Sequence, residues 1–306
     1  MSSSSFILYH YPASPFAEKV RLLAGYLDVS WQSVEVPIQP PRDQLAILAG
    51  GYRRIPVMQC GADIFCDTAV ICDEVISRAD RDLAPSSEAV LALAKRAETD
   101  VFFAAIRQRS QLKTAAGLTI MLGLKGMLAF AKDRASFAQG HGPAAQTPEV
   151  ARSAFSSFLQ DLDEMLVSQS FLGGEEPCLS DFCCYHPIFL AQGFRSVKTS
   201  ALPERVKVWM AHMAGFGWGQ YTAISSDEAM VAAKSQEPRA LPQGSADHPD
   251  VGRWVTVTPL DTGRVPVTGT LVSRSETRII VARRSEDVGM CHVHFPVSGF
   301  ECSVIN

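Results

Sequence analysis

The stretch from residue 53 to residue 71 constrains the fold most, because it joins a proline, a tight turn and a helix start. Ile55-Pro56 precedes a short apolar strand. Pro56 cannot donate a ladder hydrogen bond, so it lies at a strand edge or follows a cis peptide bond. A turn at Gly61-Ala62-Asp63 leads to a second strand and then to a helix from about Thr68 to Ala79. Asp67-Thr68 lies where the backbone N–H groups of that helix are free, which suits a peptide-like anion.

The residues before this stretch predict a compact α/β unit. Phe6–Tyr9 is a short buried strand, and the next helix begins at Pro15 with Ser14 as its N-cap. A second strand is expected within Val29–Val36 and a short helix over Asp43–Ala49. The resulting order of strands and helices is that of a thioredoxin-like unit with a mixed sheet. The first helix carries an apolar face (Phe16, Val20, Leu23, Ala24, Leu27), and its charged residues point away from that face (Glu18, Lys19, Arg21).

Ile55-Pro56, the hairpin and Asp67-Thr68 together resemble the glutathione-binding half of the N-terminal domain of glutathione transferases. The resemblance implies that Ile55 offers its backbone N–H and C=O to the cysteinyl part of glutathione, next to Pro56. Asp67 and Thr68, in place of the commoner Glu and Ser, would hold the γ-glutamyl end. Arg54 would reach the glycyl carboxylate, and Arg53 is a weaker candidate. The plainer interpretation is a helix cap at Asp67-Thr68 and a solvated loop at the two arginines.

The segment from Ser14 to Arg21 resembles the Ser-Pro-Phe opening of the serine-type transferases, such as the tau class. In that family the serine is the catalytic hydroxyl, and the resemblance gives Ser14 this role. A thiol becomes nucleophilic when ionised, and a hydroxyl donor beside a helix N-terminus favours the thiolate. Ser14 can also be a simple helix cap. Tyr9 and Tyr11 remain alternative hydroxyls, although packing roles suit them better.

The chain from about residue 86 to 219 predicts helices. One long helix is expected over Ser86–Leu112, a second over Ala115–Phe137 with a break near Gly117, and a third from Thr147-Pro148 to about residue 168. A later segment that ends in Ser180-Asp181 resembles the element that nucleates the core helix of the transferase C-terminal domain. Cys178 stands where that family has a hydroxyl, so half of the capping box is weakened. The resemblance covers residues 6–220, and it places an acceptor pocket between the two domains, with Phe102, Phe103, Ile106 and Arg107 as candidate lining residues.

The C-terminal part lies outside this resemblance. Residues 236–249 are rich in Pro, Gly and polar side chains and are interpreted as a linker. Five short strand-like runs follow within residues 250–306, which predicts a small SH3-like β-barrel. Its core would be modest, so we expect it to pack on the helical domain or on a dimer partner. The expected fold is therefore α+β and multidomain, with a thioredoxin-like domain (1–82), an all-helical domain (86–235), the linker and the barrel.

Charge, apolar stretches, cysteines and histidines bear on the partners, the compartment and the metal content expected for this chain. A net charge of -4 over 306 residues gives no reason to expect nucleic acid or a membrane as partner. The start lacks a signal peptide, and the apolar stretch from Ala115 to Ala131 is interrupted by glycines and Lys125. Eight cysteines without a CxxC pair predict free thiols in a reducing cytoplasm. His292 and His294 share a strand face, but two ligands do not make a metal site, so no metal is expected.

The sequence therefore predicts a cytoplasmic glutathione transferase that conjugates the glutathione thiolate to a small hydrophobic electrophile. Glutathione is the co-substrate, and the family resemblance implies a homodimer. The alternative is a non-catalytic module that keeps the transferase fold and binds partners through its C-terminal β domain. A glutathione-dependent thiol reductase is disfavoured, because Ser14 stands where such an enzyme needs a cysteine.

Overall fold

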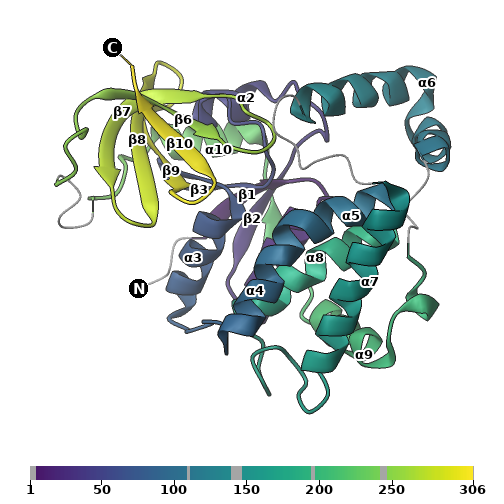
Figure 1. Cartoon of the computed structure of the whole chain (residues 1–306). Coiled ribbons are helices and arrows are strands. Elements are labelled where there is room, and N and C mark those ends of the chain that lie inside the picture. The colour runs from purple at the N-terminus through teal and green to yellow at the C-terminus, as the bar shows by residue number, and fades with distance from the viewer. Residues whose placement is uncertain (1–4, 109–110, 139–146, 194–196, 242–246, 306) are drawn as a thin grey trace.

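The computed structural model describes residues 5–108, 111–138, 147–193, 197–241 and 247–305. Within them a single mixed sheet crosses the molecule (Figure 1), in the strand order β10-β6-β7-β8-β9-β4-β3-β1-β2-β5. The strands are β1 (Phe6–His10), β2 (Trp31–Glu35), β3 (Val57–Cys60), β4 (Asp63–Cys66), β5 (Tyr221–Ala223), β6 (Trp254–Pro259), β7 (Val267–Arg274), β8 (Arg278–Ser285), β9 (Gly289–Pro296) and β10 (Phe300–Val304). Strand β5, which the sequence analysis did not predict, extends the sheet by pairing in parallel with β2.

The helices fall into three groups. The N-terminal unit contains α1 (Pro15–Tyr26), α2 (Asp43–Ala49) and α3 (Thr68–Ala79). The helical region contains α4 (Glu88–Arg96), a π-helical turn (Ala97–Val101), α5 (Phe102–Arg107), α6 (Gln111–Ala138), α7 (Pro148–Met165), α8 (Leu179–Gly193), a short 3-10 helix (Thr199–Ala201) and α9 (Glu204–Gly215). Helix α10 (Ser226–Lys234) returns to the sheet and contacts α2 and β9.

Most predicted helix starts are confirmed, and one predicted break is wrong. Ser14, Ser87 and Thr147 each cap the helix that follows, as hydroxyl oxygens accept backbone N–H bonds there. The break expected near Gly117 lies instead at Gly123, whose φ of 71° is a conformation that favours glycine. Residues 109–110, within the predicted first long helix, lie outside the described part of the chain.

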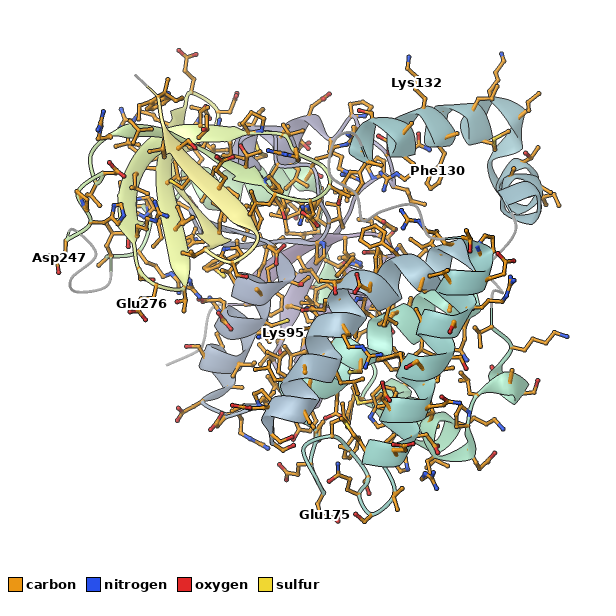
Figure 2. All side chains as sticks on the ribbon, viewed as in Figure 1. Lys95, Phe130, Lys132, Glu175, Asp247 and Glu276 are labelled. Carbon is orange, nitrogen blue, oxygen red and sulfur yellow. The ribbon has the colours of Figure 1, made fainter. Side chains whose placement is uncertain are left out.

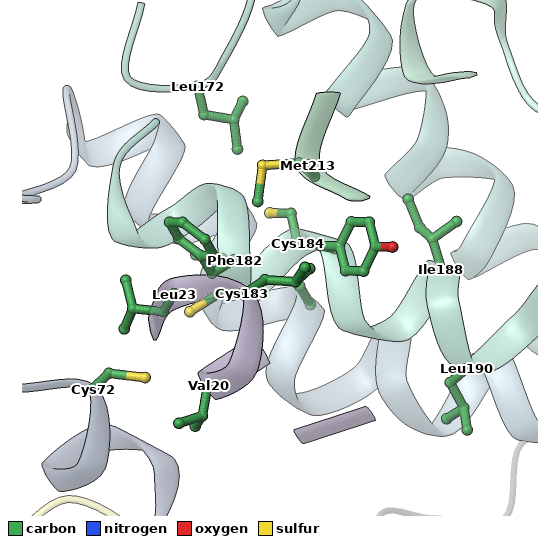
Figure 3. Close-up of a cluster of buried hydrophobic side chains, with 14 of the residues drawn as sticks. Val20, Leu23, Cys72, Leu172, Phe182, Cys183, Cys184, Ile188, Leu190 and Met213 are labelled. Carbon is green, nitrogen blue, oxygen red and sulfur yellow. The ribbon is translucent and has the colours of Figure 1, made fainter. Parts of the chain in front are cut away.

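Alternation along β1 explains how the sheet separates two cores. Phe6 and Leu8 face a core shared with α1, α3 and the helical region, whereas Ile7 and Tyr9 face a second core shared with α2, α10 and strands β6–β10. Successive side chains of a strand point to opposite faces, so an all-apolar strand requires cover on both sides. Figure 3 shows part of the first core, where Val20 and Leu23 of α1 lie beside Phe182 and Cys183 of α8.

Strands β6–β10, here called the C-terminal sheet, confirm the five predicted strands. They form an open ladder, because β10 pairs only with β6 in that ladder while β9 pairs in parallel with β4. The predicted closed SH3-like barrel is thus not what the described strands form. Val255, Val281 and Val293 of this sheet belong to the same core as Ile64 of β4. The C-terminal sheet is therefore an extension of the N-terminal sheet, with a shared core. Its β6–β7 loop also contacts the helical region, where the N–H of Gly263 donates to the carbonyl of Phe137 on α6.

The polar face of α1 is buried, which the helical periodicity did not indicate. Glu18, Lys19 and Arg21 are at most 6% exposed. Lys19 pairs with Glu98 of the π-helical turn and lies 3.9 Å from the sulfur of Cys183. Arg21 donates to Glu18 at 2.6 Å and stacks on the ring of Trp218. The helical region covers this face, and each charge survives burial because it has an opposite charge beside it.

A second ionic network fastens the C-terminal sheet to β4. The Nε2 atom of His294 lies 2.8 Å from Oδ1 of Asp63, and the His294 ring stacks on Phe65. The backbone N–H of Arg239 donates to the other Asp63 oxygen at 2.9 Å, and its guanidinium donates to Glu74. Bonds from His294 and Arg239 lower the pKa of Asp63 despite its burial. His294 belongs to β9, and Arg239 belongs to the segment after α10. These contacts therefore hold both the C-terminal sheet and the segment that leads to it against β4.

The buried ring of His186 leads to a prediction on pH stability. It packs on Phe16 and Phe102 at 4.7 and 5.8 Å, and neither ring nitrogen has a hydrogen-bond partner in the described part of the chain. Burial and Lys19 lower its pKa to about 3, against the opposing effect of Glu98. Below pH 6.5 the His186 imidazole is protonated in the unfolded chain but stays neutral in the folded chain. The free energy of unfolding therefore falls as the pH falls.

We expect His186→Phe to remove this loss. Between pH 7 and pH 5 the wild type should lose about 2 kcal/mol more unfolding free energy than the variant does. A phenylalanine ring fits between Phe16 and Phe102 with little change of volume. Urea denaturation at both pH values measures the difference. Parallel pH dependences for the two proteins would show that His186 is not responsible.

None of the helices in the described residues is long and apolar enough to cross a membrane. All eight cysteines lie in described positions and all are unpaired thiols.

Candidate functional site

Ser14 lies between β1 and α1, at the start of the helix. Its Oγ accepts the backbone N–H of Ala17 at 3.2 Å, and the residue is 1% exposed. Since that oxygen acts as acceptor in the cap, the hydroxyl hydrogen can still be donated to a thiolate. Tyr9, one of the two alternative hydroxyls, points into the second core and donates to Oε1 of Gln59 at 2.5 Å. Burial raises its pKa far above the usual value, so it is placed as a packing residue.

The loop before β3 holds the predicted backbone site. The Ile55-Pro56 peptide is cis, one of the two arrangements expected for this proline. β3 begins at Val57 and pairs with both β1 and β4, so Ile55 lies just outside the ladder. Ile55 is partly exposed, whereas Pro56 is buried. The Ile55 backbone can therefore meet a ligand without breaking a strand pairing.

Asp67 and Thr68 meet at the N-terminus of α3. Oδ1 of Asp67 accepts the N–H of Ala69 at 3.0 Å, and Thr68 is the first residue of the helix. Asp67 has a φ of 95°, uncommon for a residue with a side chain, which turns the chain sharply between β4 and α3. Burial raises the pKa of the Asp67 carboxyl, against the opposing effects of the Ala69 N–H and Arg54. The cap interpretation thus holds, and the second carboxylate oxygen faces Arg54 at 3.6 Å.

Arg53 and Arg54 are not solvated loop residues. Arg54 donates to the Thr262 carbonyl from Nε and Nη2 and pairs with the Asp261 carboxylate, both from the loop between β6 and β7. Arg53 donates to the carbonyl and carboxylate of Asp133 on α6. Sequence reasoning missed all three partners, since they lie about 80 to 208 positions away along the chain.

Arg42 is a further cation beside this loop that the sequence analysis did not single out. Its guanidinium donates to the carbonyls of Pro37, Ile38 and Arg53. Burial lowers its pKa, helped by the nearby positive charges of Arg134 and Arg53. No short motif marks this residue, because its role comes from how the loop before α2 folds back on residue 53.

The candidate acceptor residues all belong to the short helix α5, and the first of them, Phe102, lies beside α1. Phe102 contacts Phe16 at 4.7 Å and Phe103 at 5.4 Å, and the Arg107 guanidinium lies over the Phe103 ring. Ile106 is 37% exposed. An aromatic group therefore extends from the helix that Ser14 caps to the face of α5. Figure 2 shows Phe130 of α6 pointing toward this side of the molecule while Lys132 points away.

Within the described residues, no group of three or more His, Cys, Asp or Glu side chains is placed to hold a metal ion. His294 is committed to Asp63.

Comparisons with known proteins identify the family of this chain. The family described as glutathione S-transferase, N-terminal domain, matches residues 8–83, which contain Ser14, Ile55-Pro56 and Asp67-Thr68. A solved structure described as a GST-like protein from Pseudomonas syringae is 30% identical, with a TM-score of 0.75, and the match covers 98% of this chain and 99% of that one. The match therefore includes the C-terminal sheet.

Other solved structures show weaker likeness. The tau class glutathione S-transferase of mango, Mangifera indica, is 15% identical with a TM-score of 0.43, over 70% of this chain and 90% of that one. Gtt2 of Saccharomyces cerevisiae is 16% identical with a TM-score of 0.47, over 68% and 95%. The search of curated proteins found no match. The near-complete match at 30% identity, together with the N-terminal domain, shows that the chain belongs to the glutathione S-transferase family.

Proposed function

We propose that this protein is a glutathione transferase that joins the glutathione thiolate to a small hydrophobic electrophile. One observation carries the proposal: the unit that matches the transferase N-terminal domain brings a buried serine to one helix start and an Asp-Thr pair to another. Glutathione would lie along Ile55-Pro56, with its γ-glutamyl end at Asp67-Thr68. Arg54 would lie toward its glycyl end.

Ser14 would act on the sulfur. In the proposed reaction the thiol gives its proton to solvent, and the Ser14 hydroxyl donates a hydrogen bond that stabilises the thiolate. The sulfur then forms a bond to the electrophilic carbon, and the leaving group departs with its bonding electrons. The partial positive charge at the N-terminus of α1 favours the same ionised state. Phe102, Phe103, Ile106 and Arg107 would lie beside the electrophile, where apolar side chains select by size and shape.

Turnover of glutathione with chlorodinitrobenzene tests this function. We expect Ser14→Ala to lower kcat/KM by about 10- to 100-fold, the loss of one hydrogen bond to a charged group. Ser87→Ala is a matched control, because Ser87 caps α4 through an equivalent bond to Val90. It should cost similar stability and leave turnover unchanged. Equal activity in Ser14→Ala and the wild type, or equal losses in both variants, would contradict the role of Ser14.

The remaining features are proposals too. The family resemblance implies a homodimeric assembly, and the unpaired cysteines favour a cytoplasmic location. The proposed domain limits are 1–82 and 86–235, with a linker over 236–249 before the C-terminal sheet.

A further inference from the structure

The loop between β6 and β7 places a carboxylate at one end of the proposed glutathione site. Arg54, in the loop before β3, contacts this β6–β7 loop. Its Nε donates to the Thr262 carbonyl at 3.1 Å and its Nη2 to the same carbonyl at 2.6 Å. Nη2 also pairs with Oδ1 of Asp261, and the guanidinium lies over the Phe300 ring. The Arg54 side chain is 19% exposed, whereas Asp261 is 51% exposed. The arginine is thus largely enclosed by a part of the chain outside the N-terminal unit.

Arg54 already has two carboxylates beside it. Nη1 faces Oδ2 of Asp67 at 3.6 Å, so one guanidinium lies between two carboxylates. The neighbouring cations also have partners within the chain. Arg53 pairs with Asp133 of α6, and Arg42 donates to backbone carbonyls. A ligand carboxylate that approaches Arg54 must therefore displace Asp261 or meet a net negative surrounding.

The C-terminal sheet does not need the Asp261 carboxylate to stay in place. The β4–β9 pairing, the shared core and the His294–Asp63 bond already hold it. The loop itself is fixed by other contacts. The N–H of Gly263 donates to the Phe137 carbonyl at 2.8 Å, and a Cβ at Gly263 would lie 2.6 Å from the Phe137 ring. Gly263 therefore holds the loop against α6, with Asp261 beside Arg54.

We infer that Asp261 is a specificity-determining residue of the proposed site, where it competes with the carboxylate at the glycyl end of the ligand for Arg54. This inference rests on the proposed function. The wild-type site then prefers a thiol tripeptide whose glycyl end is uncharged, such as an ester or an amide, or binds it as well as free glutathione. Removing the competing charge should restore a preference for the free carboxylate.

Calorimetric titration of the full chain with reduced glutathione and with its glycyl ethyl ester tests the inference. For the wild type we expect the ester to bind at least as tightly as glutathione. Asp261→Asn should tighten glutathione binding about tenfold and change ester binding by less than about twofold, since only glutathione carries the competing carboxylate. Asp261→Glu, which keeps the charge, should retain the wild-type ratio.

Asp287→Asn is the matched control. Asp287 is exposed at the β8–β9 turn, so the variant makes the same charge change and should leave both affinities as in the wild type. Two results would overturn the role of Asp261: a wild type that binds glutathione tenfold tighter than the ester, or an Asp261→Asn variant that shifts both ligands equally or neither. Absence of binding of both ligands to the wild type would instead overturn the proposed function, and this inference with it.

Discussion

Replacing Asp181 with alanine should lower the free energy of unfolding by at least about 3 kcal/mol, because three buried N–H groups lose their acceptor. The Asp181 carboxylate is fully buried. It accepts the backbone N–H of Leu172 at 2.8 Å, that of Cys178 at 2.9 Å and the indole N–H of Trp209 at 2.8 Å. These bonds tie the loop before α8 and the helix α9 to the start of α8.

Urea denaturation followed by tryptophan fluorescence measures this loss. Asp161→Ala is a suitable control, since Asp161 pairs with Arg96 on the surface, with both side chains more than a third exposed. Exposed pairs contribute little, so this variant should stay within about 0.5 kcal/mol of the wild type. A denaturation midpoint for Asp181→Ala equal to that of the control would mean that the carboxylate does not organise the helical region.

The predictions that held depend on local rules. The starts of α1 and α3 follow from a capping residue at Ser14 and at Asp67, and both caps are made by side chains within three residues of the N–H they satisfy. Helix α10 begins with a cap of the same local kind, a reciprocal bond between Ser225 and Glu228, although the sequence analysis did not predict it. The capping role of Asp181 also survives the change to cysteine at residue 178, because the Cys178 N–H rather than its side chain is the main partner.

Other features depend on residues far apart in the sequence. A helical pattern shows which face of α1 is apolar, but not that Glu98 and Trp218 will bury its charged face. The same limit applies to the site. The sequence predicts that Arg54 contacts a ligand, but its partners Asp261 and Thr262 belong to a part of the chain in which no functional motif is recognised.

The C-terminal sheet illustrates how tertiary pairing decides an architecture. Its strands alternate clearly, and strand alternation alone suggested a closed barrel. The apolar edge strand β4 offers unpaired backbone groups, and β9 satisfies them with His292–His294 in register against Asp63–Phe65. Once β9 is paired on that side and with β8 on the other, it has no edge left to close a barrel.

Loss of Asp67 and Thr68 should abolish glutathione binding with little effect on folding. Asp67→Asn keeps an oxygen that can cap α3, so the helix start remains. Thr68→Ala removes a hydroxyl that is 8% exposed. The double variant removes one charged and one neutral contact to the γ-glutamyl end, and we expect its affinity to fall by about 100-fold or more. Asp43→Asn, an exposed acid at the start of α2, is the control for charge and should bind as the wild type does.

Calorimetric titration of the wild-type chain with reduced glutathione, beside the Asp67→Asn, Thr68→Ala double variant, is the most direct test of the glutathione site. We predict saturable binding in the wild type and in Asp43→Asn, and its loss in the double variant. A wild type that gives no binding heat at millimolar glutathione would contradict the proposed function. The transferase fold would then serve as a non-catalytic binding module.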